Sequence, residues 1–361
     1  MTSSRISSCR SACRADLVVE DVALRAFRSY ERLELSLQPG LVLAVGPNGV
    51  GKTNLLEALH VATQGFSPRT RTDAQLIRFG ATGARIAVRG TRATTPLEIE
   101  VVLEPGQAKR AKLNGAALRT AEQLRGETAT LVFTPDRLGV VKGAPAARRA
   151  YFDRVLGRLA PARAGLPAEY GAAVAQRNAA LRLRSQALDA WTEQVVDLGV
   201  QLVASRKETL AALAAPFAER AGELGLPEGE LRYAGEPPTL EAMAARLDRD
   251  LDRGITGLGP HLDDIVIASG PRELRSYGSQ GEQRLAVLAL LLAEAELIVD
   301  RRGFAPLLLL DDVLSELDPA RRRILAERVR LGTQALITAT DAAMLPWEPD
   351  QLVEVTPGSA R

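Results

Sequence analysis

The sequence predicts an α/β fold in which a domain of mixed sheet and flanking helices is interrupted by a mainly helical arm. Three observations support this prediction. Residues 41–64 follow the order strand, glycine-rich turn and helix, and a second series of helices and strands begins after residue 276. Between them, residues 146–253 consist mostly of alanine, leucine, arginine and glutamate, a composition that favours helices. An α/β pattern at both ends with helices between is typical of one domain that carries an insertion.

The composition is that of an ordinary globular chain. Its 361 residues are 46% hydrophobic and 25% charged, with a net charge of +2, which neither requires nor excludes a nucleic-acid partner. The most apolar stretch, residues 285–299, contains Glu294 and Glu296. We therefore predict a buried helix there and no membrane span.

The first 16 residues form a leader rich in serine and arginine, which we expect to be disordered. It holds both cysteines of the chain, Cys9 and Cys13. Their spacing is compatible with half of a metal site, but the sequence offers no further ligands to complete it. Unpaired cysteines and the lack of an apolar export signal predict a cytoplasmic location.

The α/β domain is expected over residues 17–134 and 276–361. Apolar and alternating runs predict strands before Gly46 and between residues 84 and 104. The pair Asn114–Gly115 predicts a hairpin turn.

The arm is expected over residues 135–275, with one or two long helices over residues 173–217. Glycines and prolines interrupt it too often for a long coiled coil, so a plain helical bundle explains the pattern. The pattern returns to loop and strand at residues 256–270.

Residues 46–53 read GPNGVGKT and match the pattern G-x-x-x-x-G-K-[ST] at every fixed position. Glycines allow the backbone to curl so that successive N–H groups face an anion, and the following helix start adds positive charge. The pattern predicts a nucleotide site in which Lys52 reaches the β- and γ-phosphates and Thr53 offers its hydroxyl to Mg²⁺.

Two acidic residues follow a second buried strand. Asp311 and Asp312 come directly after the all-leucine run 307–310, at the strand end where ligands bind in open α/β sheets. We expect Asp311 to hold Mg²⁺, and Asp312 to orient or deprotonate the attacking water. The alternative is that one of the two aspartates only caps the next helix.

A second helix start also carries an anion-binding pattern. Ser279, Gln280 and Gly281 precede a helix, and a serine hydroxyl beside exposed N–H groups can bind an anion. The alternative is an ordinary helix cap, because Glu282 stands three residues after Ser279 and completes a capping box.

The order of these segments resembles that of ABC-type ATPases. SQGEQR, then LLLLDD, then SELD at residues 315–318 resemble the signature motif, the Walker B motif and the D-loop. The resemblance implies an ABC-type ATPase head in which the signature of one chain contacts the γ-phosphate bound by another. Two chains would then pair head to tail, with ATP between them.

Longer blocks resemble the RecF family of bacterial recombination mediators. They run from FRSYERLELSLQPG through LVFTPDRLGVVKGAPAARRAYFD, QRNAAL and TGLGPHLDDI to ITATD, in order, over residues 18–341. The resemblance implies a head similar to those of SMC proteins, without their long coiled coil. It implies binding to double-stranded DNA or to single-strand/double-strand junctions, slow DNA-stimulated ATP hydrolysis, and partnership with RecR. RecO acts in the same pathway, which helps RecA load onto gapped DNA.

The resemblance also assigns residues to roles. Catalytic roles fall to Lys52, Asp312 and Ser279, and Mg²⁺ binding to Thr53 and Asp311. Nucleotide contacts are implied for Gly46, Pro47, Asn48, Gly49, Val50, Gly51, Lys52, Thr53, Asn54, Arg28, Ser279, Gln280, Gly281 and Glu282.

DNA contacts would come from basic side chains that bind phosphates without base preference, although such side chains are often only solvated. The candidates are Arg69, Arg71, Lys109, Arg110, Lys112, Arg148 and Arg149.

Two other classes of protein carry a phosphate loop. A transporter ATPase would need a Q-loop glutamine and a switch histidine, and neither is evident, since residues 338–341 replace the histidine. A P-loop kinase would bind ATP as a monomer and leaves the stretch SYGSQGEQR at residues 276–284 unexplained.

Overall fold

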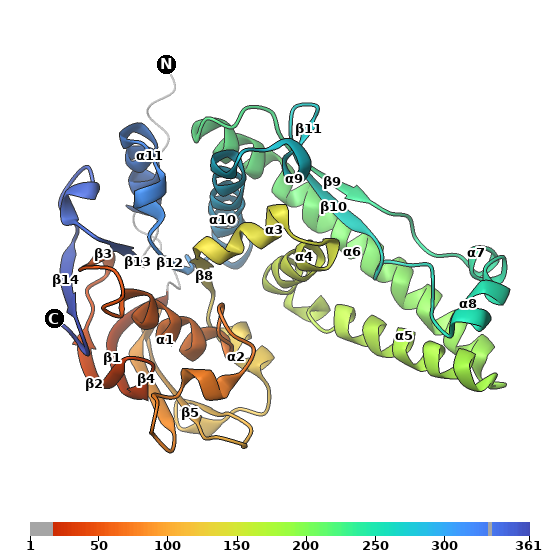
Figure 1. Ribbon diagram of the computed structural model, residues 1–361, viewed down its shortest axis with the longest axis horizontal. Coiled ribbons are helices and arrows are strands. Elements are labelled where there is room, and N and C mark those ends of the chain that lie inside the picture. Colours follow the sequence, from red (N-terminus) through yellow and green to blue (C-terminus); the bar gives the residue numbers. More distant parts are fainter. Residues whose placement is uncertain (1–16, 331–333) are drawn as a thin grey trace. The chain divides into compact units, whose positions relative to one another are not determined.

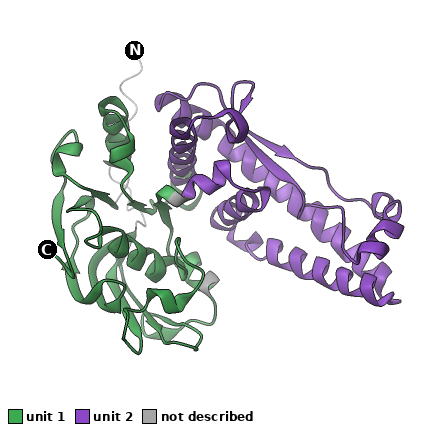
Figure 2. Cartoon of the chain, in the orientation of Figure 1, with its two compact units in different colours: residues 1–135, 298–361 green, residues 136–297 purple. Residues whose placement is uncertain are grey.

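The computed structural model describes residues 17–330 and 334–361. The predicted disordered leader, residues 1–16, lies outside the described residues. The chain forms two compact units, one of residues 1–135 and 298–361 and one of residues 136–297 (Figure 2). The second unit therefore continues past residue 275, where we expected the arm to end.

Helix α10 (Gln280–Arg302) explains this difference. Its buried Glu294 accepts hydrogen bonds from Tyr151 and Arg158, which belong to the second unit. The helix is thus held to the arm at Glu294, and the second unit includes it as far as Leu297, although its sequence reads as part of the α/β domain.

The first unit contains a largely parallel sheet in the order β15-β14-β3-β13-β12-β8 (Figure 1). All neighbouring pairs except β14 with β15 are parallel. Residues of β12 and β13 are buried throughout, as expected of parallel strands that are covered on both faces. The strands are β3 (Gly40–Val45), β8 (Thr130–Phe133), β12 (Leu307–Leu310), β13 (Gln334–Ala339), β14 (Gln351–Thr356) and β15 (Ser359–Ala360).

A second sheet of the first unit is antiparallel, in the order β2-β1-β4-β5-β6-β7. Buried and exposed residues alternate along β4 and β5, so one face is packed and the other is solvated. Asn114 and Gly115 have positive φ values of 49° and 81° and join β6 to β7, which confirms the predicted hairpin. The strands are β1 (Leu17–Phe27), β2 (Tyr30–Ser36), β4 (Ala84–Arg92), β5 (Thr95–Leu103), β6 (Arg110–Leu113) and β7 (Ala116–Ala117).

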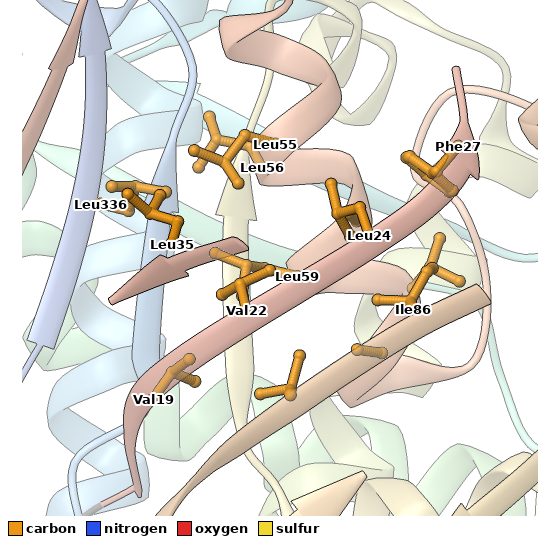
Figure 3. Packing of buried hydrophobic residues seen from close by; sticks show 14 of the residues in the cluster. Val19, Val22, Leu24, Phe27, Leu35, Leu55, Leu56, Leu59, Ile86 and Leu336 are labelled. Carbon is orange, nitrogen blue, oxygen red and sulfur yellow. The ribbon is translucent and has the colours of Figure 1, made fainter. Parts of the chain in front are cut away.

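Helix α1 (Lys52–Gln64) and both sheets share one hydrophobic core. Leu55, Leu56 and Leu59 of α1 lie with Leu24 of β1 and Leu336 of β13 in this core (Figure 3). Burying side chains of this size stabilises the fold by about 1.5–3 kcal/mol each. The same packing fixes the direction of α1, whose first turn follows the phosphate loop.

A polar contact also joins the two sheets. The buried Gln334 side chain of β13 accepts the Val19 N–H of β1 at 2.8 Å and donates to the Val19 carbonyl oxygen at 2.7 Å. Because both backbone groups are satisfied, the end of β1 can stay buried against the parallel sheet.

The second unit is mainly helical, with a small sheet of order β11-β10-β9. The predicted long helical stretch is two helices, α5 (Leu166–Leu183) and α6 (Leu188–Glu223), which pack together. Arg184 ends α5 in the left-handed conformation. The strands are β9 (Gly229–Ala234), β10 (Asp264–Ser269) and β11 (Arg272–Glu273).

Shorter elements complete the described chain, and none of the described helices combines the length and apolar composition that a membrane span needs. The remaining helices are α2 (Ala121–Glu127), α3 (Gly139–Lys142), α4 (Pro145–Leu159), α7 (Leu240–Ala244), α8 (Leu247–Arg253), α9 (Leu274–Tyr277) and α11 (Pro319–Arg330). The 3-10 helices are η1 (Asp73–Leu76), η2 (Pro135–Leu138), η3 (Pro161–Arg163), η4 (Val313–Glu316) and η5 (Ala342–Met344).

Candidate nucleotide-binding site

The predicted phosphate loop connects β3 to α1 and depends on its glycines. Gly51, directly before α1, has φ 120°, and a Cβ there would lie 2.9 Å from Ser29 Oγ and 3.1 Å from the Tyr30 hydroxyl. A Cβ at Gly46 would lie 2.3 Å from the Val355 carbonyl oxygen. Side chains at these two positions would therefore strain the backbone and clash.

Lys52 lies across this loop. Its Nζ donates to the carbonyl oxygens of Gly46 at 2.6 Å and Pro47 at 2.9 Å. Burial lowers the pKa of the Lys52 ammonium, while the nearby carboxylates of Asp312 and Asp311 raise it. The loop, the cation and the two acids predicted from separate motifs are thus gathered at one place in the first unit.

Thr53 and Asp311 also meet, although 258 positions separate them. The Thr53 hydroxyl donates to Asp311 Oδ1 at 3.0 Å. Burial raises the pKa of the Asp311 carboxyl, against hydrogen bonds from Thr338 and Thr53 that lower it. A hydroxyl and a carboxylate are hard oxygen ligands of the kind that Mg²⁺ prefers, so these residues fit the predicted metal role.

The described residues contain no cluster of three or more His, Cys, Asp or Glu side chains that could cage a metal. Mg²⁺ usually keeps several waters and binds through one or two carboxylates plus substrate phosphates. One carboxylate beside a phosphate loop is therefore a donor set suited to Mg²⁺ that arrives with a nucleotide.

Asp312 has an unusual backbone for a residue other than glycine. Its φ and ψ are 48° and 29°, in the left-handed region, and its N–H donates to Thr338 Oγ1 at 2.9 Å. Its Oδ1 is buried and has no hydrogen-bond partner among the described residues. The side chain therefore keeps an acceptor available for a water or another donor at the site.

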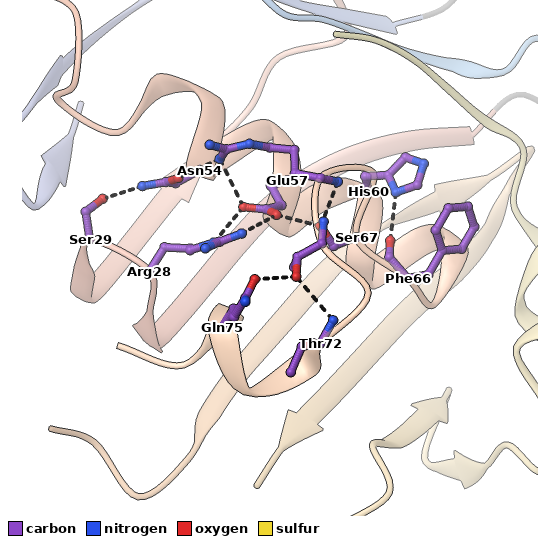
Figure 4. A network of polar contacts seen from close by, with 11 residues as sticks. Arg28, Ser29, Asn54, Glu57, His60, Phe66, Ser67, Thr72 and Gln75 are labelled. Carbon is purple, nitrogen blue, oxygen red and sulfur yellow. Dashed lines mark hydrogen bonds and ion pairs between the residues drawn. The ribbon is translucent and has the colours of Figure 1, made fainter. Parts of the chain in front are cut away.

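A polar network beside the loop is centred on Glu57 of α1 (Figure 4). The Glu57 side chain is buried, and its two oxygens accept bonds of 2.8 Å from Arg28 Nε and Nη2. Ser67 Oγ adds a bond of 2.6 Å, and Arg69 lies 3.4 Å away. A buried carboxylate is stable only when it is paired in this way.

This network fixes the turn between β1 and β2 against α1. Asn54 Nδ2 donates to Ser29 Oγ at 2.9 Å, and the Tyr30 hydroxyl donates to the Gly51 carbonyl oxygen at 3.1 Å. Burial raises the pKa of the Tyr30 hydroxyl to about 12, so it stays protonated. Arg28 is thereby held near the first turn of α1, where we expected a nucleotide contact.

Sequence reasoning missed Glu57, Tyr30 and Thr338. Glu57 interrupts the apolar face of a helix, and Thr338 is a hydroxyl in an otherwise apolar strand. Both are polar residues at positions that the periodicity marks as buried, and such residues need partners. This signal could have singled them out, but it does not say which partners they find.

The predicted signature begins α10 in the second unit. Ser279 Oγ accepts the Glu282 N–H at 3.2 Å, and the Glu282 carboxylate accepts the Ser279 N–H at 2.8 Å. The bond from this N–H lowers the pKa of the Glu282 carboxyl. The predicted capping box is thus present, while Ser279, Gln280 and Gly281 stay exposed.

One of the predicted DNA contacts is wrong. The Arg148 side chain is only 2% exposed and makes two bonds of 2.7 Å to the carboxylate of Asp264. Its position on the packed face of α4 leaves no access to DNA. Its neighbour Arg149 donates to the Asp263 carbonyl oxygen, and partial burial lowers the pKa of this guanidinium.

The other candidate cations differ in their partners. Lys109 pairs with Asp73 at 2.9 Å and Arg110 with Glu104 at 2.6 Å. Arg71 and Lys112 are exposed, and neither side chain forms an ion pair or a hydrogen bond with another described residue.

Almost the whole described chain is similar to a known family of proteins. The family described as RecF/RecN/SMC N terminal domain matches residues 18–360. A "DNA replication and repair protein RecF" from Kineococcus radiotolerans is 38% identical over 95% of this chain and 98% of its own length. One from Symbiobacterium thermophilum is 37% identical, over 90% and 92%.

Solved structures agree with the sequence comparisons. The structure of a recombination mediator protein RecF with ATP superposes with a TM-score of 0.86 at 26% identity, over 98% of this chain and 99% of its own. An SMC head bound to a domain of ScpA shares the fold, with a TM-score of 0.59 at 20% identity over 95% and 96%. The predicted ABC-type ATPase head fold is confirmed. The chain belongs to the RecF family.

Proposed function

We propose that the chain is an ATP-dependent DNA-binding protein of recombinational repair. The observation that carries this proposal is that Thr53 of the phosphate loop donates to Asp311, while Lys52 of the same loop lies close enough for this carboxylate to raise its pKa. The names of the relatives, which refer to DNA replication and repair, and the solved RecF with ATP support the same role.

ATP binds at the phosphate loop, with its phosphates held by loop N–H groups and by Lys52. Thr53 and Asp311 would hold Mg²⁺, which would neutralise charge on the phosphates of the nucleotide. Arg28, fixed by Glu57, contacts the nucleotide from the β1–β2 turn.

Hydrolysis uses Asp312 to orient or deprotonate the attacking water. Its unpartnered Oδ1 supports this assignment. Turnover is slow, because the chain has no histidine at residues 338–341 to assist at the γ-phosphate as in transporter ATPases.

The second catalytic half comes from another copy of the chain. Ser279 and its neighbours are exposed and contact the γ-phosphate bound by a partner molecule. Two chains therefore pair head to tail with ATP between them, and hydrolysis releases the pair. This is the general logic of a switch held closed by a γ-phosphate.

The pair binds double-stranded DNA, with preference for gaps or single-strand/double-strand junctions. Exposed cations such as Arg71 and Lys112 supply phosphate contacts, which makes the affinity dependent on salt. RecR is the direct protein partner and RecO acts in the same pathway, so that RecA loads onto gapped DNA in the cytoplasm.

ATP hydrolysis measured with and without gapped DNA tests this function. We expect slow basal hydrolysis that DNA stimulates several-fold, an increase that DNA-free lipid vesicles do not produce. Hydrolysis that ignores DNA, or transfer of phosphate to a small molecule, would favour a transporter subunit or a kinase and would overturn the proposal.

A further inference from the structure

Thr338 occupies a central position in the parallel sheet. It lies on β13, between β3, which enters the phosphate loop, and β12, which ends at Asp311. Thr338 pairs in register with Ala44, and Ile337 pairs with Leu310. The Thr338 side chain is fully buried, so its hydroxyl must find its partners at this carboxyl edge of the sheet.

The Thr338 hydroxyl forms one hydrogen bond with Asp311 and one with Asp312. Oγ1 donates to Asp311 Oδ1 at 2.8 Å and accepts the Asp312 N–H at 2.9 Å. The directions are fixed by chemistry, because a backbone N–H can only donate and a hydroxyl has one hydrogen. One side chain thereby holds the side chain of one acid and the backbone of the next.

The bond to the Asp312 N–H coincides with a strained backbone. Asp312 has φ 48°, a conformation that aspartate tolerates but does not prefer. Such conformations persist when surrounding contacts determine them. Removing the acceptor would leave this half-buried N–H without its protein partner and would release the backbone that aims the Asp312 side chain.

We propose that Thr338 is a positioning residue for ATP hydrolysis, which holds the backbone of Asp312 so that its carboxylate meets the attacking water. The inference rests on the proposed function, since it assigns Asp312 its role there. In this proposal Thr338 acts through Asp312 and not by a contact of its own with the nucleotide. Its effect should therefore appear in turnover and not in nucleotide binding.

Three variants of the full chain test this role. Thr338→Val keeps the shape but removes the hydroxyl, and Thr338→Ser restores the hydroxyl without the methyl group. Thr95→Val is the matched control, because Thr95 is exposed at the start of β5 in the antiparallel sheet. Thermal unfolding of each variant confirms folding, and Thr338→Ala replaces the valine variant if that one does not fold.

We expect Thr338→Val to lower kcat roughly 10- to 100-fold while KM and the Kd for Mg·ATP change by less than about threefold. Thr338→Ser should stay within about threefold of the unchanged chain, and so should Thr95→Val. A valine variant with unchanged kcat, or a serine variant as slow as valine, would overturn the proposal.

A second measurement separates this inference from the proposed function. Amide hydrogen exchange of the Asp312 N–H, followed without ATP, should accelerate in Thr338→Val and stay unchanged in Thr338→Ser and Thr95→Val. If the unchanged chain does not hydrolyse ATP while exchange at Asp312 still accelerates in Thr338→Val, the proposed function fails, but Thr338 is still shown to hold the Asp312 backbone. Unchanged exchange at Asp312 in Thr338→Val would refute the positioning role, whatever the chain hydrolyses.

Discussion

Helices α1 and α10 both begin at sites predicted to meet a phosphate, yet they begin in different ways. Helix α1 follows Gly51, has no side-chain cap and carries no acidic residue in its first turn. Helix α10 starts with a capping box between Ser279 and Glu282, and Glu282 also pairs with Arg272 at 3.1 Å.

This difference affects how readily the N-terminus of each helix can bind an anion. At α1 the N–H groups and the positive end of the helix are left for a ligand. At α10 the capping box bonds the N–H groups of Ser279 and Glu282 and places a carboxylate beside this helix start. A phosphate that approaches α10 therefore has to act against Glu282, which suits a contact made only when a partner already holds the nucleotide.

Removing the Lys52 ammonium at the start of α1 should have the largest effect, a loss of ATP binding. We expect Lys52→Met to weaken ATP binding at least about 100-fold, because the charge that faces the phosphates is lost. Equilibrium binding of ATP measures this. Lys207→Met, which changes a half-exposed lysine of the second unit, serves as the control and should bind normally; equal loss in both variants would contradict the assignment.

Asp312, which lies near the start of α1, should affect the rate of ATP hydrolysis and not ATP binding. We expect Asp312→Asn to lower kcat by roughly 100-fold while ATP binding and pairing persist, because only the base is lost. Single-turnover hydrolysis measures the change. Hydrolysis at the normal rate would remove Asp312 from the reaction.

At the start of α10, a bulky cation should prevent the pairing of two chains without preventing the binding of ATP. Ser279→Arg should bind ATP with an affinity within about threefold of normal but lose ATP-dependent pairing, because the side chain blocks the partner's site. Ser359→Arg adds the same charge at an exposed position of β15 and should still pair. A Ser279→Arg chain that pairs normally would show that the signature has no role across the interface.

The carboxylate at the second start offers a smaller test. Glu282→Gln keeps a side chain that can accept the Ser279 N–H but removes the negative charge. ATP-dependent pairing should strengthen by about twofold to fivefold, the size of a charge effect at a helix start. Sedimentation at several concentrations measures it, and weaker pairing would mean that the charge helps and does not oppose the contact.

Low pH should remove the stabilising contribution of the Glu282 carboxylate at the start of α10. The Glu282 pKa is lowered from its ordinary value of 4.5 by the Ser279 N–H, so the carboxylate stabilises the folded chain above that value. This contribution is lost as the pH falls through the lowered pKa. The difference in melting temperature between the unchanged chain and Glu282→Gln should therefore shrink below pH 4.5; a constant difference would contradict it.

The features that could be predicted are those that local sequence determines. The phosphate loop needs glycines at fixed spacing, the leucine strand β12 is a continuous apolar run, and the Asn114–Gly115 turn needs two positive φ values. Each is specified within a few residues, so a pattern is sufficient to find it.

The features that could not be predicted depend on distant partners. Arg148 looks like any basic helix residue until Asp264, 116 positions away, pairs with it. Glu57 joins Arg28 and Ser67 from three different segments, and Thr338 reaches Asp311 across neighbouring strands. Sequence identifies such residues as polar and buried, but only the fold decides which charge faces which.

The mass of the chain in solution tests the central claim, that each molecule supplies only half of each reaction site. It should be measured by light scattering with a non-hydrolysable ATP analogue, Mg²⁺ and gapped DNA, after subtraction of the DNA. We predict a species of twice the mass of one chain that disappears when the nucleotide is omitted. A single chain at saturating nucleotide and DNA would contradict the account.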